Sequence, residues 1–375
     1  MSSRRRVIVV GAGFGGLAAV ARLLERGGGA LEVTLIAPGR RATYLAGTLD
    51  VTLNGTDPGR FSVEVGLEGV RCLDATVDLV LDGGVMIGGQ RIAGDAVIAA
   101  PGLALGEIPD WPRAAAAWDP AGAARARAAL PELGGGRVLV AACSLPYRCP
   151  PAPFALAIGL AERGRLAGRE THVVVATPEP LPLAGVGGEA PELVLDACAA
   201  AGVTVESGFA ADPDASEDGV LRSSDGRELA YDAAFLVPPH VRPSCLSQLP
   251  GDGPVVPVGD RGAVSAHASP LYVVGDAAAT GLPRAGGVAR ALARAAADGV
   301  LETLGIAPAP PPEPIKASCF MLHPGGAVSR LRVSFSGDDR RVQIDGPSPD
   351  LAVARQDAHR RFLDEAAGRR SGAAA

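Results

Sequence analysis

The sequence is poor in aromatic residues, in cysteine and in net positive charge. Only 4% of its 375 residues are aromatic, six are cysteines, and the net charge is −6. Six cysteines in so long a chain do not form a disulfide scaffold, which argues against a small disulfide-stabilised secreted protein. A negative net charge argues against nucleic acid as a partner, because phosphate binding requires a basic face. We assign no metal site to the sequence.

The sequence also lacks long apolar runs. The basic residues Arg4–Arg6 are followed by about four apolar residues before glycines interrupt them, whereas a secretory signal needs roughly 7–15. No later stretch approaches the roughly 18 apolar residues of a membrane span. The C-terminal segment 351–370 has few large apolar residues among many charges, so we expect at most weak membrane association. These absences predict a soluble, cytoplasmic protein.

Glycine, proline and apolar residues are abundant by contrast. The chain has 50 glycines and 32 prolines, and 47% of its residues are hydrophobic. Its length suffices for two or three domains with filled cores. We therefore expect many tight backbone turns between buried elements.

A glycine-rich turn lies close to the N-terminus. Val7–Val10 is an apolar strand, GAGFGG follows it at 11–16, and apolar residues then recur at helical spacing up to Arg26. A second apolar strand is expected at Leu31–Ala37. A strand–turn–helix–strand unit of this kind begins a doubly wound α/β sheet.

The glycines of this turn have the spacing of a dinucleotide-binding fingerprint. In such a motif Gly11 allows the tight turn, Gly13 allows close approach of a pyrophosphate, and Gly16 allows the helix to pack on the strand. The pyrophosphate would bind the amides at the helix N-terminus, and we include Phe14 among the cofactor-binding residues. The alternative is a turn that is merely rich in glycine.

The acidic residue that usually binds the adenosine ribose is missing. The second strand ends at Ala37, and Arg40 and Arg41 follow it. Arginines at this point can accommodate a 2′-phosphate and would then favour NADP. They can equally be exposed to solvent or contact the pyrophosphate. We assign Arg40 to the cofactor site.

A second motif indicates a flavin. Gly275 and Asp276 end an apolar strand about 260 residues after the first turn. Such an aspartate can bind ribityl hydroxyls, and the amides that open a helix at Gly286 would face the electron-rich pyrimidine edge of a flavin. The alternative role for Asp276 is a helix cap. The two motifs in this order predict bound FAD.

A second strand–turn–helix unit begins at Arg137, but its turn has no glycine. The turn reads CSLPYRCPPAPF at 143–154, with two cysteines and four prolines. Strands and helices alternate after it until the stiff crossing VPPHVRP at 237–243. Further helices are expected at 154–163, 191–201 and 286–304, and further strands at 172–176 and 233–237. Hairpins are expected around 223–226 and over 331–344, and a polar helix after the second of them.

These patterns predict two Rossmann-like dinucleotide-binding domains, one inserted in the other, and a small C-terminal α+β region. The predicted domains are residues 1–105 with 244–306 for a discontinuous FAD-binding domain, 106–243 for a degenerate NAD-like domain, and 307–375 for a C-terminal interface or redox region. The proline-rich segment 307–314 is expected to be a semi-rigid spacer.

Along nearly its whole length the chain resembles the sulfide:quinone oxidoreductase and flavocytochrome c sulfide dehydrogenase group of the pyridine nucleotide-disulfide oxidoreductase superfamily. The matching segments are VIVVGAGFGG, YRCPPAPF, VPPHVRP, YVVGDAAATGLPRAGG and KASCFML. The resemblance implies a redox-active cysteine pair beside the flavin, by position Cys149 and Cys319. It also implies oxidation of sulfide, a persulfide or a small thiol, with electrons passed through FAD to quinone or a cytochrome. A homodimer is compatible with the sequence.

The composition of the second turn suits a sulfur atom that is held in place. Prolines at 150, 151 and 153 fix φ and remove donors, which stiffens the backbone around Cys149. The N-terminus of the helix that follows is expected to favour the thiolate. The alternative is that Cys149 and Cys319 are both buried, inert thiols.

The chain departs from the pattern of this group in two ways. Its members commonly carry a glutamate soon after the first cysteine as a proton carrier, but residues 153–155 offer none, and His323 could take this role. Some members attach flavin through a cysteine that segment 42–51 lacks, so we expect non-covalent FAD. Two alternatives stay open: an NADP-linked flavoprotein reductase, which Arg40 and Arg41 would suit, and a flavin-poor, non-catalytic homologue, which Ala37 and the missing glutamate suggest. Cys143 is the best candidate for a third participating sulfur.

Overall fold

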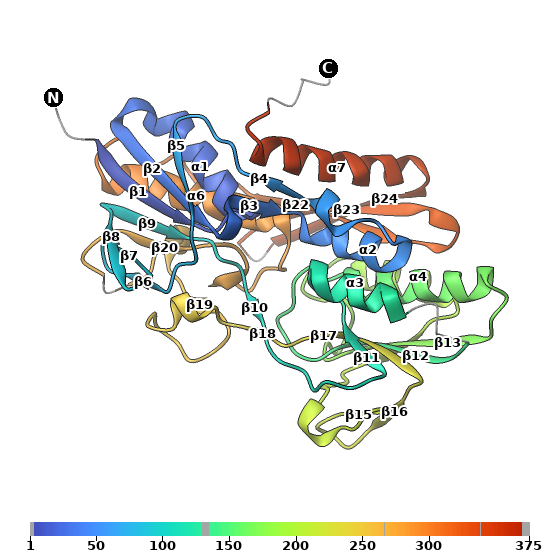
Figure 1. Cartoon of the computed structure of the whole chain (residues 1–375). Helices are drawn as coiled ribbons and strands as arrows, with labels where there is room; N and C mark the ends of the chain where they lie inside the picture. Colours follow the sequence, from blue (N-terminus) through green and yellow to red (C-terminus); the bar gives the residue numbers. More distant parts are fainter. Residues whose placement is uncertain (1–3, 130–134, 266, 338, 370–375) are drawn as a thin grey trace.

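The computed structural model describes residues 4–129, 135–265, 267–337 and 339–369. The chain forms two α/β lobes, with a C-terminal sheet and helix lying against both of them (Figure 1). In the described part of the chain, no helix combines the length and the hydropathy that crossing a membrane would require.

The first lobe is built on a five-stranded parallel sheet with β1 at its centre. The strand order is β20-β9-β1-β2-β5, with β20 at Leu271–Val273, β9 at Ala96–Ala99, β1 at Arg5–Val10, β2 at Leu31–Ala37 and β5 at Val70–Asp74. Side chains alternate along a strand, so Val7 and Val9 pack towards helices α1 (Phe14–Gly27) and α6 (Gly286–Thr303). Ile8 and Val10 pack on the opposite face.

The opposite face of this sheet is covered by small antiparallel pieces. A three-stranded sheet and the segments around Leu246 and Val256 complete this core. The smaller strands of the lobe are β3 at Arg41–Thr43, β4 at Ser62–Glu64, β6 at Leu79–Leu81, β7 at Gly84–Ile87, β8 at Gln90–Ala93, β19 at Val256–Pro257 and β21 at Ala278–Ala279.

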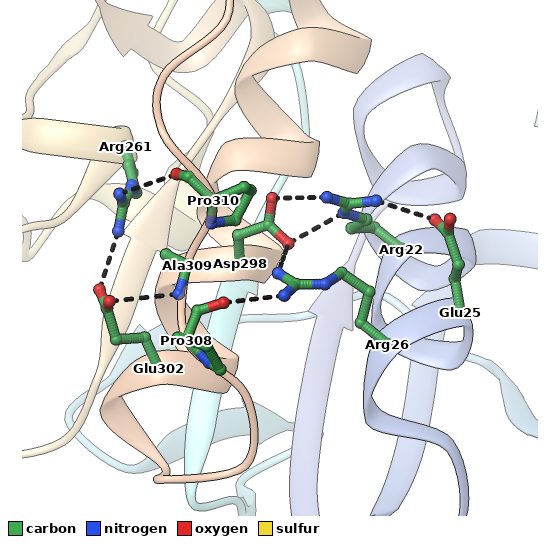
Figure 2. A network of polar contacts seen from close by, with 9 residues as sticks. All are labelled: Arg22, Glu25, Arg26, Arg261, Asp298, Glu302, Pro308, Ala309 and Pro310. Carbon is green, nitrogen blue, oxygen red and sulfur yellow. Dashed lines mark hydrogen bonds and ion pairs between the residues drawn. The ribbon is translucent and has the colours of Figure 1, made fainter.

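Helices α1 and α6 are joined by an ionic network around one buried carboxylate (Figure 2). Asp298 of α6 is 5% exposed and accepts hydrogen bonds from Arg22 at 2.9 Å and Arg26 at 2.7 Å, both on α1. Arg26 also donates to the carbonyl of Pro308 at 2.8 Å, and Arg261 donates to the carbonyl of Pro310 at 3.5 Å. The network therefore fixes the proline-rich spacer where it leaves α6.

The second lobe repeats the parallel architecture. Its strand order is β11-β17-β12-β13-β14, with β11 at Ala114–Ala116, β17 at Ala233–Val237, β12 at Gly136–Ala142, β13 at Thr171–Thr177 and β14 at Thr204–Ser207. Its helices are α3 at Pro120–Ala129, α4 at Ala152–Leu166 and α5 at Ala190–Ala200, and β15 at Val220–Arg222 pairs antiparallel with β16 at Glu228–Ala230.

The chain crosses between the lobes twice, and the two crossings lie side by side. Strand β10 at Ala104–Leu105 pairs antiparallel with β18 at His240–Val241. All strands of the second sheet fall between these crossings, whereas the first sheet takes strands from both sides of them. The second lobe is therefore an insertion into the first.

The C-terminal part is a three-stranded antiparallel sheet followed by one helix. The strands are β22 at Ile315–Leu322, β23 at Val328–Ser336 and β24 at Asp339–Ser348, and the helix is α7 at Asp350–Ala366. Met321, Leu331 and Phe335 of this sheet join the same core as α4 of the second lobe. The sheet thus carries the C-terminal cysteine back to the junction of the lobes.

The predicted fold class, two Rossmann-like sheets in one α/β chain, is confirmed by these two parallel sheets. The expected helices and both hairpins form with bounds that shift by a few residues. Two helices were not expected, α2 at Thr48–Asn54 and α3. Neither sequence has strong helical periodicity. The two helices pack against each other, a contact that the local sequence does not reveal.

Candidate functional site

A cavity of about 840 Å³ lies where the two lobes and the C-terminal part meet. Its size is within the roughly 300–1,000 Å³ of small-molecule and cofactor sites. Its lining comes from the glycine turn, the segments after β2, β9 and β20, the cysteine–proline turn, the start of α6, the sheet strands β22 and β23, and α7. The predicted site residues among its lining are Gly11, Gly13, Phe14, Cys149, Gly275, Asp276, Gly286 and Cys319.

The three fingerprint glycines have different surroundings. Gly11 has φ +94°, and a Cβ there would lie 2.4 Å from the carbonyl oxygen of Ala100. A Cβ on Gly16 would lie 1.7 Å from the Gly11 oxygen, so this glycine lets α1 pack on the turn. A Cβ on Gly13 would meet nothing within 4 Å. Gly13 thus leaves its backbone open to the cavity at the helix N-terminus, which fits a bound pyrophosphate.

The arginines after β2 are placed differently from each other. Arg40 has φ +47°, is exposed and pairs with Glu64, and it does not line the cavity. Arg41 does line the cavity, and its Nε donates to Ser62 Oγ at 3.0 Å. The assignment of Arg40 to the cofactor site stays a prediction, and the neighbouring Arg41 has the placement that this role requires.

The segment after β20 contributes polar groups to the cavity. Burial raises the pKa of Asp276, and Arg284 and Arg148 oppose this rise. Arg284 Nη1 donates to the Ala278 carbonyl at 2.7 Å, while its buried Nε has no hydrogen-bond partner among the described residues. An orphaned donor beside a carboxyl group and a helix N-terminus at Gly286 matches the polar groups that a flavin presents. The residues present therefore fit FAD.

The cysteine–proline turn holds Cys149 in an unusual backbone conformation. Cys149 has φ +59°, a region that residues other than glycine seldom adopt. Its N–H donates to the Arg284 carbonyl at 2.9 Å, and its carbonyl accepts from Ala152 at 2.8 Å. These bonds tie the turn to the segment after β20 and to the start of α4. The strained residue is thus fixed from both lobes.

Cys319 reaches the same cavity from the middle of β22. It pairs with Leu331 of β23 in the sheet register, and Leu331 is fully buried. Both Cys149 and Cys319 are free, half-buried thiols that line the cavity. Two residues far apart in sequence therefore line one cavity, and their pairing and redox role stay predictions.

The acidity of the two thiols differs from what the sequence suggested. Burial raises the pKa of Cys149 to about 11, although Arg355, Arg148 and a hydrogen bond from Ala152 lower it. Burial and the neighbouring Cys149 raise the pKa of Cys319 to about 12. The helix N-terminus acts in the expected direction, but desolvation of the charged form outweighs it. Both groups are therefore thiols, not thiolates, at neutral pH.

Sequence reasoning missed two residues of the cavity wall, Arg355 and Tyr44, and the carboxylate of Asp50 that holds Arg355. Arg355 of α7 donates to Asp50 of α2 at 3.1 and 2.6 Å, and Tyr44 lies beside them. Burial raises the pKa of Tyr44 to about 12, and Arg355 opposes this rise. The Tyr44 ring packs on Phe14 and Phe362 at centroid distances of 5.8 and 5.6 Å. No local sequence signal marks this group, because its members come from distant segments.

Two of the predicted participants lie elsewhere. His323 follows β22 but does not line the cavity, and its buried Nε2 has no partner among the described residues. Cys143 is buried in the core on the far side of the second sheet, with Leu139 and Phe209. Burial raises its pKa to about 12. The roles of His323 and Cys143 stay predictions that this geometry does not support.

In the second lobe, the carboxylate after the second strand of the unit is bound by the protein itself. Glu179 follows β13, where a dinucleotide-binding unit often carries a ribose-binding carboxylate. The buried Tyr147, from the cysteine–proline turn, donates to this carboxylate at 2.8 Å. A side chain of the turn thus engages the carboxylate that a ribose would otherwise contact.

No family model matches the sequence. Among solved structures, the sulfide:quinone oxidoreductase of the hyperthermophilic bacterium Aquifex aeolicus superposes with TM-score 0.83 and 18% identity, over 97% of this chain and 92% of that one. A chain in the mitochondrial ATP synthase of Tetrahymena thermophila has TM-score 0.73 and 13% identity, over 98% and 96%. The NAD-dependent persulfide reductase of A. fulgidus has TM-score 0.60 and 14% identity, over 96% and 77%. The resemblance drawn from sequence is thereby confirmed for the fold.

Proposed function

We propose that this chain is an FAD-dependent oxidoreductase that oxidises sulfide, a persulfide or a small thiol through Cys149 and Cys319. The observation that carries the proposal is that both cysteines line one cavity with the glycine turn and Asp276. The Aquifex oxidoreductase and the A. fulgidus reductase are also both named for sulfur compounds, sulfide and persulfide.

Separate groups of this chain would hold the cofactor. Gly11, Gly13 and the N-terminus of α1 would bind the pyrophosphate, and Asp276 would bind ribityl hydroxyls. The N-terminus of α6 and Arg284 would face the pyrimidine edge. FAD, when bound, supplies a two-electron acceptor and the link to quinone or a cytochrome. The linkage is non-covalent, because segment 42–51 has no cysteine.

The sulfur chemistry would start from the disulfide form of the pair. A hydrosulfide or thiolate attacks one sulfur, so that the bond between Cys149 and Cys319 breaks and one new sulfur–sulfur bond forms. One cysteine then carries a persulfide or mixed disulfide, and the other leaves as a thiolate with the electron pair. The substrate is oxidised and the disulfide is reduced in this step, with no other reactant.

The test is the visible spectrum of the purified protein during anaerobic addition of sulfide. We expect a yellow protein whose flavin bands bleach with sulfide, and whose colour moves to the supernatant on acid precipitation. Colour that stays in the pellet would contradict the non-covalent link. A colourless protein would favour the non-catalytic alternative, and a yellow protein that sulfide leaves unchanged would refute the proposed reaction.

The same spectrum distinguishes the NADP-linked alternative. Tyr147 donates a hydrogen bond to Glu179, the carboxylate that would contact the ribose of a second dinucleotide. NADH and NADPH should therefore leave the flavin oxidised for minutes. Rapid bleaching by NADPH would establish a reductase of that class and would give Arg41 a role at the 2′-phosphate.

A further inference from the structure

A second, much smaller cavity lies beside Cys149. Its volume is about 30 Å³, which exceeds the roughly 10–15 Å³ that one water-sized particle needs and is far below the size of a cofactor site. Arg148 and Cys149 line both this cavity and the large one, so they lie between the two. The small cavity therefore adjoins the thiol of the proposed reaction and has room for a small particle.

The wall of the small cavity is mostly apolar and carries one positive charge. Segment 45–49, Trp118 of the second lobe and Ala152 of α4 supply most of its surface. Among the described residues that line it, Arg148 is the one charged group. A cation in such a wall attracts an anion strongly, because little water is present to screen its charge.

Arg148 is held in place by both its main chain and its side chain. Its N–H bonds Nε2 of the buried His240 at 3.4 Å, and its carbonyl accepts from the Trp118 indole at 3.4 Å. Its guanidinium donates to the carbonyl of Trp118. An arginine keeps its charge when it is half-buried, and one that is already fixed binds an anion without a further loss of side-chain freedom.

The charge of Arg148 is not neutralised by a carboxylate. Three other arginines that line the large cavity are each ion-paired: Arg290 with Glu365, Arg330 with Asp345 and Arg355 with Asp50. Within the described ranges the Arg148 guanidinium forms no such pair, although the charges of Asp276 and Asp119 act on it. A half-buried charge costs free energy unless a counter-charge lies close to it. An anion in the small cavity would supply that counter-charge.

We propose that Arg148 and the small cavity form a subsite for a sulfur-sized monoanion beside Cys149. The inference deepens the proposed function and rests on it, since the anion in that reaction is the hydrosulfide that attacks the disulfide. Arg148 is then a binding residue that contacts the substrate, while Trp118 and His240 are positioning residues that act through it. The size of the cavity admits this anion and excludes the bulk of a larger thiol.

The chain offers a matched control in Arg127 of α3. This arginine is also half-buried, and it also donates to a main-chain carbonyl, that of Leu53 at 3.0 Å. It lines neither cavity. Arg163 donates to the same carbonyl at 2.6 Å, so the loss of Arg127 leaves that acceptor bonded.

The first test locates an anion without using any reaction. Bromide is a monoanion of about the size of hydrosulfide, and anomalous diffraction locates it in crystals of the full-length protein soaked in sodium bromide. We expect a bromide peak between Arg148 and Cys149 in the parent, in Arg148→Lys and in Arg127→Gln, and none in Arg148→Gln. No peak in the parent, or the same peak in Arg148→Gln, would overturn the inference. The parent crystal alone therefore decides if Arg148→Gln does not fold.

The second test separates binding from chemistry. In anaerobic bleaching by sulfide, Arg148→Gln should raise the sulfide concentration for the half-maximal rate on the order of 10-fold or more, with a smaller effect on the maximal rate. Arg148→Lys should restore much of this loss, and Arg127→Gln should match the parent. If Arg148 only held the turn, Lys and Gln would lower the maximal rate alike. A parent protein that sulfide does not bleach refutes the proposed reaction, whereas the bromide result still tests the subsite.

Discussion

The two parallel sheets carry the same strand–turn–helix unit and use its turn in opposite ways. In the first lobe the turn is built from glycines, and the space beside Gly13 is open. In the second lobe the turn is built from prolines and sulfur, and its Tyr147 hydroxyl donates to the Glu179 carboxylate. The comparison teaches that the strand and helix fix where a turn points, whereas its side chains decide whether it receives a nucleotide or presents a thiol.

The two units also differ at the end of their second strand, where a ribose-binding acid is usually found. The first lobe has open glycines but ends its strand with the buried Ala37. The second lobe has no glycine in its turn but keeps an acid, Glu179, which Tyr147 binds. A carboxylate at this position therefore does not indicate a nucleotide site unless the turn beside it is open.

The largest expected effect concerns the packing of the first turn. Gly16→Ala places a Cβ where only 1.7 Å separates it from the Gly11 oxygen, so the turn or α1 must move, at a cost on the order of 3 kcal/mol. We expect loss of bound flavin and a much lower melting temperature. Gly29→Ala is the control, because a Cβ there meets nothing within 4 Å. Full flavin content in Gly16→Ala would show that this turn does not hold the cofactor.

A smaller effect is expected at the thiol of the second turn. Burial raises the pKa of Cys149 to about 11, compared with about 8.5 for a free cysteine. The thiolate fraction at pH 8 is therefore lower, and alkylation of Cys149 should be on the order of 100-fold slower than that of glutathione. The rate should still be rising at pH 10. A plateau below pH 9 would contradict a buried thiol.

The smallest effect concerns the hydrogen bond that closes the second turn. Tyr147→Phe removes a donor from the half-buried Glu179 carboxylate and should reduce the free energy of unfolding by about 1–3 kcal/mol at pH 7. Burial raises the pKa of Glu179, and the Tyr147 hydroxyl opposes this rise. The variant's deficit should therefore shrink as the pH falls and Glu179 becomes protonated. Urea unfolding at pH 7 and pH 4 measures both values.

Tyr231→Phe is the matched control for this hydrogen bond. Tyr231 is also fully buried in the second lobe, but its hydroxyl has no partner among the described residues. Its removal should leave stability unchanged or raise it slightly. Equal losses in the two variants would mean that Tyr147 contributes ring packing and not a closing bond.

Local patterns were sufficient for much of the fold and for the residues that short motifs mark. The glycine turn, the segment of Asp276 after β20 and the cysteine–proline turn are each continuous in the sequence, so their sequence reveals them. The features that we did not predict depend on contacts between segments that are far apart in the sequence. Arg355 and Asp50 are 305 positions apart, and no periodicity links them. The raised pKa of Cys149 follows from burial, which only the packed structure determines.

The central claim is tested most directly by flavin bleaching in single cysteine variants. Cys149→Ser and Cys319→Ser should bind flavin as the parent protein does, yet sulfide should no longer bleach it, because the disulfide cannot form. Cys198→Ser, which changes a buried core cysteine outside the cavity, should bleach at the parental rate. Bleaching of Cys319→Ser at the parental rate would contradict the account.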